Sequence, residues 1–198
     1  TALEGWIQRD LMLALCRQAG LDFEALKQAA QRRDFRPVTL AGASLSAHYA
    51  VDAKLITSRN VVGLLPGRSR PDETVIYSAH WDHLGIGLPD AKGDRIYNGA
   101  VDNATGTAAL IELARAFAQG PRPERSGVFL NVTAEEKGLL GSEYYATHPL
   151  YPLAKTVGVI NMDALDPHGP ARNFSISGTA RLDLLDDLIT VAGKHGMS

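Results

Sequence analysis

Four separate segments of the chain carry a histidine or a carboxylate at positions where an apolar strand would end or a helix would begin. These residues are His80, Asp82, Asp102, Glu135, Glu136 and Asp163. Carboxylates gathered in an apolar setting repel one another and lose solvation, and a bound cation removes both costs. Histidine together with carboxylates is a ligand set typical of zinc, and one carboxylate can bridge two metals.

Each of these residues has an ordinary interpretation when it stands alone. A histidine after a strand is usually a surface or hydrogen-bonded residue, and an aspartate in the place of Asp102 is usually a helix N-cap. The adjacent pair Glu135-Glu136 would usually be a solvated loop. The metal interpretation depends on all of them lying at strand-end loops of one pattern, because ligands of open α/β sheets bind at the carboxyl ends of strands.

The segments that must position these residues alternate between strands and helices. Short apolar runs predict the strands, and a period of three to four residues predicts the helices. The expected strands cover 60–65, 74–79, 128–133, 157–162 and 174–177, and the expected helices cover 105–118, 141–147 and 182–192. This order predicts an α/β fold with a mixed, mostly parallel central sheet that helices flank on both faces.

The N-terminal part has a different character. Residues 1–35 predict two helices, the second capped by Asp22, and residues 45–51 alternate between apolar and polar, which predicts a strand. We therefore expect a helical N-terminal segment over 1–45 and a partial catalytic domain over 46–198.

Composition excludes several functional classes. The chain of 198 residues is 45% hydrophobic with a formal net charge of −2, and it has no long basic run, so nucleic acid is not an expected partner. No run approaches the roughly 20 apolar residues of a membrane span. Cys16 is the single cysteine, and no Gly-x-Ser-x-Gly elbow occurs, which disfavours a cysteine or serine nucleophile.

The four segments together resemble the zinc-site blocks of the co-catalytic di-zinc exopeptidases. That family includes aminopeptidase Y-type enzymes, bacterial leucyl aminopeptidases and the glutamate carboxypeptidase group. The similar blocks are Ser78–Gly85, Gly99–Gly106, Thr133–Gly141 and Ile160–Asp163, and the likeness runs in order from about Thr57 to Gly178. The resemblance implies a zinc-exopeptidase fold, two zinc ions in a complete site and a peptide substrate.

The resemblance also implies a role for each residue. His80 and Asp163 would bind one zinc, Asp102 would bridge both, and Glu136 would bind the second. Glu135 would be the general base. Asp82 would hold the His80 ring through its other nitrogen. The family pattern further implies a cis peptide bond between Asp102 and Asn103.

The chain departs from the family pattern in two places. The family has a fifth ligand, a histidine on a later loop, and no residue here fits that block, so it is expected beyond Ser198 and the chain is expected to be C-terminally truncated. The second zinc site, with only Asp102 and Glu136, is then expected to be weak or empty. His83 is expected to line the entrance or pack locally rather than bind metal. Residues 1–45 resemble the return from an inserted protease-associated domain.

Three functions remain open at this point. An aminopeptidase is the leading prediction, and carboxypeptidase or glutaminyl cyclase action on the same fold is the second. A receptor-like ectodomain without metals is the third, and the full set of polar residues up to Ser198 disfavours it. The chain begins at Thr1 without a signal peptide, as a processed form or fragment would, and we expect a periplasmic or secreted location.

Overall fold

The computed structural model describes residues 5–52, 54–176 and 183–197. The chain divides into two compact units, Thr1–Leu55 and Ile56–Ser198. This division falls about ten residues later than the boundary expected after residue 45, and the domain assignment itself stays a prediction.

The first unit contains the two predicted helices, α1 (Arg9–Gln18) and α2 (Phe23–Ala29). Asp22 caps α2 as predicted, because its side chain accepts a hydrogen bond from the Ala25 amide. Cys16 is buried in α1, with 1% of its surface exposed.

The strand predicted over residues 45–51 is wrong. These residues form no strand, and Leu45 and Val51 are 84% and 74% exposed. Alternation of apolar and polar residues stabilises a strand only where its apolar face is covered, and here Leu45 and Val51 stay exposed.

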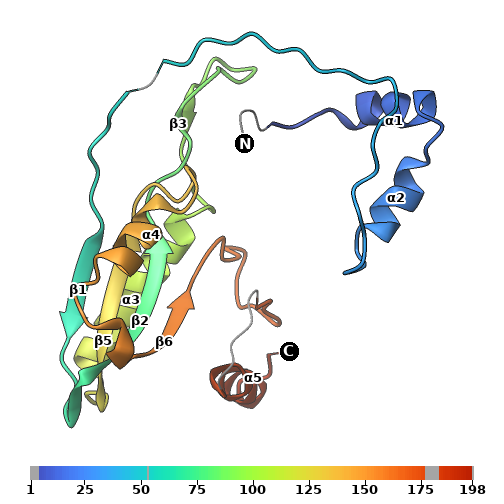
Figure 1. The fold of residues 1–198 in the computed structure, drawn as a ribbon. Helices are drawn as coiled ribbons and strands as arrows, with labels where there is room; N and C mark the ends of the chain where they lie inside the picture. Colours follow the sequence, from blue (N-terminus) through green and yellow to red (C-terminus); the bar gives the residue numbers. More distant parts are fainter. Residues whose placement is uncertain (1–4, 53, 177–182, 198) are drawn as a thin grey trace. The chain divides into compact units, whose positions relative to one another are not determined.

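The second unit is built on a four-stranded sheet in the order β1-β5-β2-β6 (Figure 1). The strands are β1 (Val61–Leu65), β2 (Arg70–His80), β5 (Arg125–Val132) and β6 (Thr156–Asn161). β2 runs parallel to β5 and to β6, whereas β1 is antiparallel to β5. The predicted mixed, mostly parallel sheet is therefore confirmed, and the carboxyl ends of β2, β5 and β6 lie at one edge.

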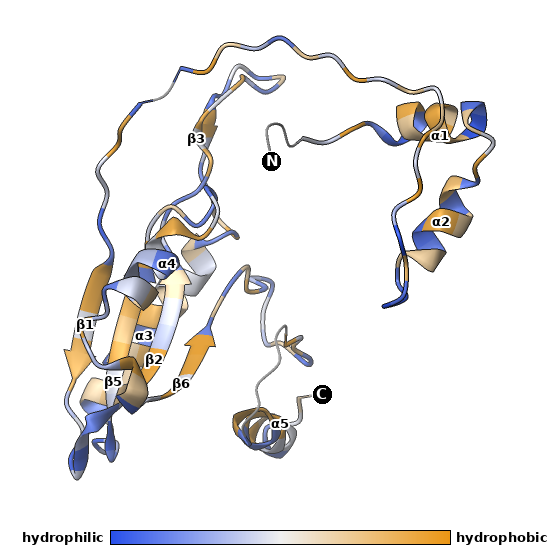
Figure 2. Cartoon of the chain, viewed as in Figure 1, coloured by the Kyte–Doolittle hydropathy of each residue, from blue (hydrophilic) through white to orange (hydrophobic). Residues whose placement is uncertain are grey.

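Figure 2 colours most of β1, β5 and β6 as hydrophobic, and two clusters of buried apolar residues pack against the sheet. On one face Val128, Leu130 and Val132 of β5 pack against Tyr145 of α4 (Leu140–Thr147). On the other face Phe129 and Ala79 pack against α3 (Ala104–Gln119). Successive strand residues point to opposite faces, so a continuous apolar run in β5 serves both layers.

The predicted apolar face of the helix over 105–118 is confirmed. Its members Leu110, Leu113, Ala114 and Phe117 all belong to the cluster beneath α3. Tyr77 and Phe129 stack in that cluster with ring centroids 5.7 Å apart. This packing anchors α3 on the sheet and so fixes where its N-terminus lies.

The remaining elements differ in part from the prediction. A two-stranded hairpin, β3 (Gly85–Ile86) with β4 (Ile96–Tyr97), was not predicted. A 3-10 turn, η1 (Leu153–Lys155), precedes β6. Of the strand predicted over 174–177, residues 174–176 form no strand, and Ser177 lies outside the described residues. The last predicted helix is α5 (Leu184–Lys194), and Leu182 lies outside the described residues. No helix in the described ranges is long and apolar enough to cross a membrane.

Candidate metal centre

His80, the last residue of β2, lies at the centre of the site. Its ring is buried, with 2% of the side-chain surface exposed. Nδ1 lies 3.0 Å from the backbone oxygen of Asp82. Because a carbonyl oxygen only accepts, Nδ1 carries the hydrogen in this contact, and Nε2 of the neutral ring is left with a lone pair.

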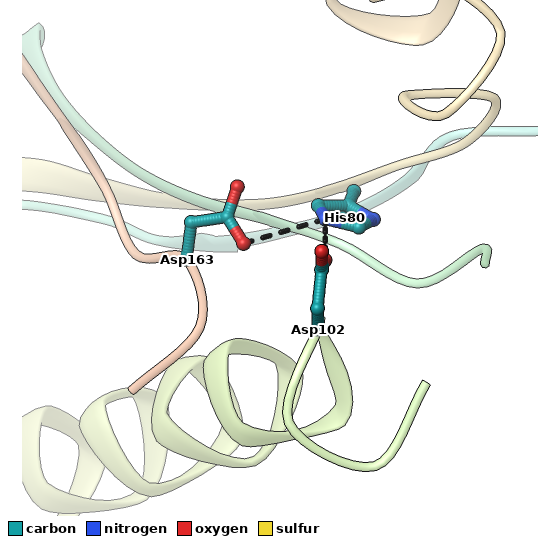
Figure 3. Close-up of side chains that lie close together, drawn as sticks. All are labelled: His80, Asp102 and Asp163. Carbon is teal, nitrogen blue, oxygen red and sulfur yellow. Dashed lines mark ion pairs between the residues drawn. The ribbon is translucent and has the colours of Figure 1, made fainter. Parts of the chain in front are cut away.

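That lone pair faces two carboxylates (Figure 3). His80 Nε2 lies 2.9 Å from Asp102 Oδ1 and 3.5 Å from Asp163 Oδ1, and the three residues converge from β2, the loop before α3 and the end of β6. Nε2 is buried and makes no hydrogen bond despite the short distance to Asp102. Three atoms that all offer electron pairs repel one another unless a cation lies among them. We call His80, Asp102 and Asp163 the first cluster.

The pKa of His80 also indicates that the surroundings of its ring favour a positive charge. Burial, the largest effect, lowers the pKa of His80, whereas the Asp82 carbonyl and the carboxylates of Asp163, Glu135 and Asp102 raise it. The raising effects win, and the pKa of His80 lies above its ordinary value. The cluster therefore favours a cation at this position, and one nitrogen with two carboxylate oxygens is a donor set that fits zinc.

Asn103 sets the separation of Asp102 from Asp163. It is 2% exposed, and its Oδ1 accepts a hydrogen bond from the Gly106 amide as the N-cap of α3. Its Nδ2 donates to the backbone oxygen of Met162, 3.0 Å away. One side chain thus ties the start of α3 to the end of β6. Because Asn103 is the N-cap, the Asp102 carboxylate is not used for capping, and the expected cis peptide bond between Asp102 and Asn103 is present.

Asp82 contacts the site in a different way from the expected one. The atom that meets His80 Nδ1 is the Asp82 backbone oxygen, and the nearer carboxylate oxygen lies 3.7 Å away. The carboxylate instead accepts hydrogen bonds from the backbone amides of Glu135 and Glu136, at 3.1 and 3.4 Å. Asp82 therefore ties the loop after β2 to the loop after β5.

Glu135 borders the first cluster. Its Oε2 lies 3.9 Å from His80 Nε2, and 29% of its side chain is exposed. Burial, the largest effect, raises the pKa of Glu135; the neighbouring His80 lowers it, and nearby carboxylates raise it further. The net pKa lies above the ordinary value, so Glu135 is a stronger base than a solvated glutamate.

His83 and Glu136 form a second group with Asp102. His83 Nδ1 lies 2.6 Å from Glu136 Oε1, and possible ligand atoms of His83, Asp102 and Glu136 all lie within 4.8 Å of one another. We call these three residues the second cluster. Asp102 belongs to both clusters, which is the geometry that a bridging carboxylate requires.

All six residues singled out from the sequence therefore lie together. Two further residues contact the site: His83, which was expected only to line the entrance or pack locally, and Asn103, which was not singled out from the sequence. Asn103 offered a signal, because an asparagine three residues before Gly106 at the start of a helical run is a typical N-cap. No local sequence signal pointed to the contact between His83 and Glu136, since the two residues are 53 positions apart.

Comparison with known proteins identifies relatives of this chain. The chain is 36% identical over 129 residues to an aminopeptidase, NAALADL1, of Mus musculus, covering 62% of this chain and 16% of that protein. It is 31% identical over 167 residues to a probable glutamate carboxypeptidase, LAMP1, of Arabidopsis thaliana, covering 82% of this chain and 22% of that protein. The chain thus spans less than a quarter of either relative.

A solved structure agrees with the fold. A zinc aminopeptidase from Bacillus subtilis superimposes with a TM-score of 0.54 at 24% identity, over 70% of this chain and 33% of that one. The likeness confirms the predicted fold class. The model of peptidase family M28 matches residues 60–198, which contain every residue of both clusters. The resemblance expected from the four sequence blocks is confirmed, and the chain belongs to peptidase family M28.

Proposed function

We propose that the protein to which this chain belongs is a zinc-dependent exopeptidase that removes the N-terminal residue of peptides. The observation that carries the proposal is the buried lone pair of His80 Nε2, which faces the Asp102 and Asp163 carboxylates. Zinc would be held by these three residues, with Asp102 shared with a second zinc that Glu136 also binds. Relatives and a structural neighbour named as aminopeptidases and zinc enzymes support this choice.

Glu135 would be the general base. Bound zinc supplies polarisation of the scissile carbonyl and lowers the pKa of a nearby water. Glu135, beside the first cluster and with a raised pKa, accepts a proton from the attacking water and passes it to the leaving amine. The amides of Glu135 and Glu136 both donate to Asp82, so one contact orients a base and a metal ligand together.

Zinc content and end-group preference test the proposal. The full-length protein should hold two zinc ions and hydrolyse aminoacyl-p-nitroanilides, and a chelator should abolish hydrolysis until zinc is returned. An N-acetylated anilide should not be cleaved, since the free amine is the recognised group. Absence of both bound zinc and chelator-sensitive hydrolysis would refute the proposal.

Carboxypeptidase action is the second candidate, because the Arabidopsis relative carries that name and matches 82% of this chain. It predicts release of the C-terminal residue from an N-acetylated peptide, which an aminopeptidase leaves intact. Cyclases of this superfamily use one zinc, whereas Asp102 shared by two clusters favours two. The periplasmic or secreted location stays a prediction.

A further inference from the structure

His83 faces Glu136 across the site and has no part in the function proposed above. Their side chains are 22% and 17% exposed, so the contact between Nδ1 and Oε1 is largely shielded from solvent. An ionised carboxylate only accepts hydrogen bonds. At 2.6 Å, His83 Nδ1 therefore donates its hydrogen to Glu136 Oε1.

The separations distinguish a hydrogen bond from shared coordination. Two donors at about 2.0–2.1 Å from one tetrahedral zinc lie about 3.3 Å apart. In the first cluster, His80 Nε2 lies 2.9 and 3.5 Å from its two carboxylate oxygens, on either side of that value. The 2.6 Å between His83 and Glu136 is well below it and matches a direct hydrogen bond.

The backbone holds the His83 ring in this place. Gly99 has a φ of +64°, and a Cβ added to it would lie 2.7 Å from His83 Cβ and 2.6 Å from the Asp102 backbone oxygen. His83 thus packs directly on the Gly99 backbone, three residues before the shared carboxylate of Asp102. On the opposite side of the contact, the backbone amide of Glu136 donates a hydrogen bond to the Asp82 carboxylate. Glu136 is therefore held by its main chain and by its side chain.

We propose that His83 is a positioning residue of the second metal site. Its Nδ1–H holds Oε1 of Glu136, which leaves Oε2 as the oxygen available to the metal shared with Asp102. A hydrogen-bonded carboxylate ligand keeps one orientation, and loss of such outer contacts typically weakens metal binding by roughly 10–100-fold. The inference rests on the proposed two-zinc function, and it assigns His83 an effect on the second zinc alone.

Stepwise zinc binding to the full-length apoprotein, measured by competition with a chromophoric chelator, tests the assignment. His83→Leu should weaken the second zinc by roughly 10–100-fold and leave the first unchanged. His83→Asn should restore most of the loss, because the asparagine amide nitrogen can occupy the place of Nδ1. His48→Leu, at an exposed histidine of the first unit, is the matched control and should bind both zinc ions normally.

Three other results of the zinc titration would contradict the role of His83 or the two-zinc function. If the variants H83N and H83L lose the second zinc equally, His83 is a ligand rather than a positioning residue. Unchanged binding in H83L removes its role and leaves the proposed function intact. If H83L does not fold, H83Q serves in its place, since the glutamine nitrogen reaches past the Nδ1 position and should not match H83N. A wild-type protein with only one zinc refutes the two-zinc function and this inference together.

Discussion

Gly106→Ala provides a sharp test of how packing sets the metal-site geometry. Gly106 lies in the first turn of α3, directly against the N-cap Asn103 and the end of β6. A Cβ added there would lie 2.5 Å from the Met162 backbone oxygen and would overlap Asn103 Oδ1. The helix start must then move away from β6, and it carries Asp102 away from Asp163.

The expected magnitude follows from the contacts. Ordinary carbon-to-oxygen contacts are about 3.3 Å, so the helix start must shift by about 0.8 Å relative to Met162. Overpacking of this kind costs about 1–3 kcal/mol, and a buried Asn103 that loses its partners adds about 1–3 kcal/mol. The gain from replacing glycine by alanine in a helix is only about 1 kcal/mol. We expect a net loss of about 3 kcal/mol in the free energy of unfolding.

Denaturant unfolding and zinc titration of the full-length protein measure both consequences. Gly106→Ala should lower stability by about 3 kcal/mol and weaken the first zinc by at least about tenfold, because an outer-contact change has that effect on a ligand. Gly193→Ala in α5, where a Cβ meets nothing within 4 Å, is the matched control and should be neutral or slightly stabilising. Unaltered stability and zinc affinity in Gly106→Ala would refute the argument that Asn103 and Gly106 set the separation.

Three further results are expected. Glu135→Gln should reduce kcat by roughly 100-fold or more while both zinc ions stay bound, since it removes only the base; retained turnover in a steady-state assay would contradict that role. Asp163→Asn should weaken the first zinc by more than about 100-fold in a zinc titration, because a charged ligand becomes a neutral amide. Asn60→Ala should cost about 1–3 kcal/mol in denaturant unfolding, because Asn60 accepts from the Thr133 amide and donates to the Gly141 oxygen; equal stability would exclude this bridge as a determinant of the fold.

Much of the fold could be predicted because it depends on local pattern. The cap at Asp22, the apolar face of α3 and the positions of the strands that carry the site each follow from residues close together in sequence. The prediction of a strand over 45–51 was wrong because the alternation of apolar and polar residues does not show whether a neighbouring strand is present to pair with it. The β3–β4 hairpin was missed because two-residue strands leave almost no periodic signal.

The candidate site was likewise predictable in part from the sequence and in part only from the structure. The sequence by itself indicated six residues of the candidate site and predicted that they would meet, because parallel strands bring their carboxyl ends to one edge of the sheet. Only the tertiary structure decided which atoms touch. It placed the Asp82 backbone oxygen rather than its carboxylate on His80, and it brought His83 to Glu136. Such contacts depend on ångström-scale packing between segments dozens of residues apart, and no local pattern of residue types encodes that distance.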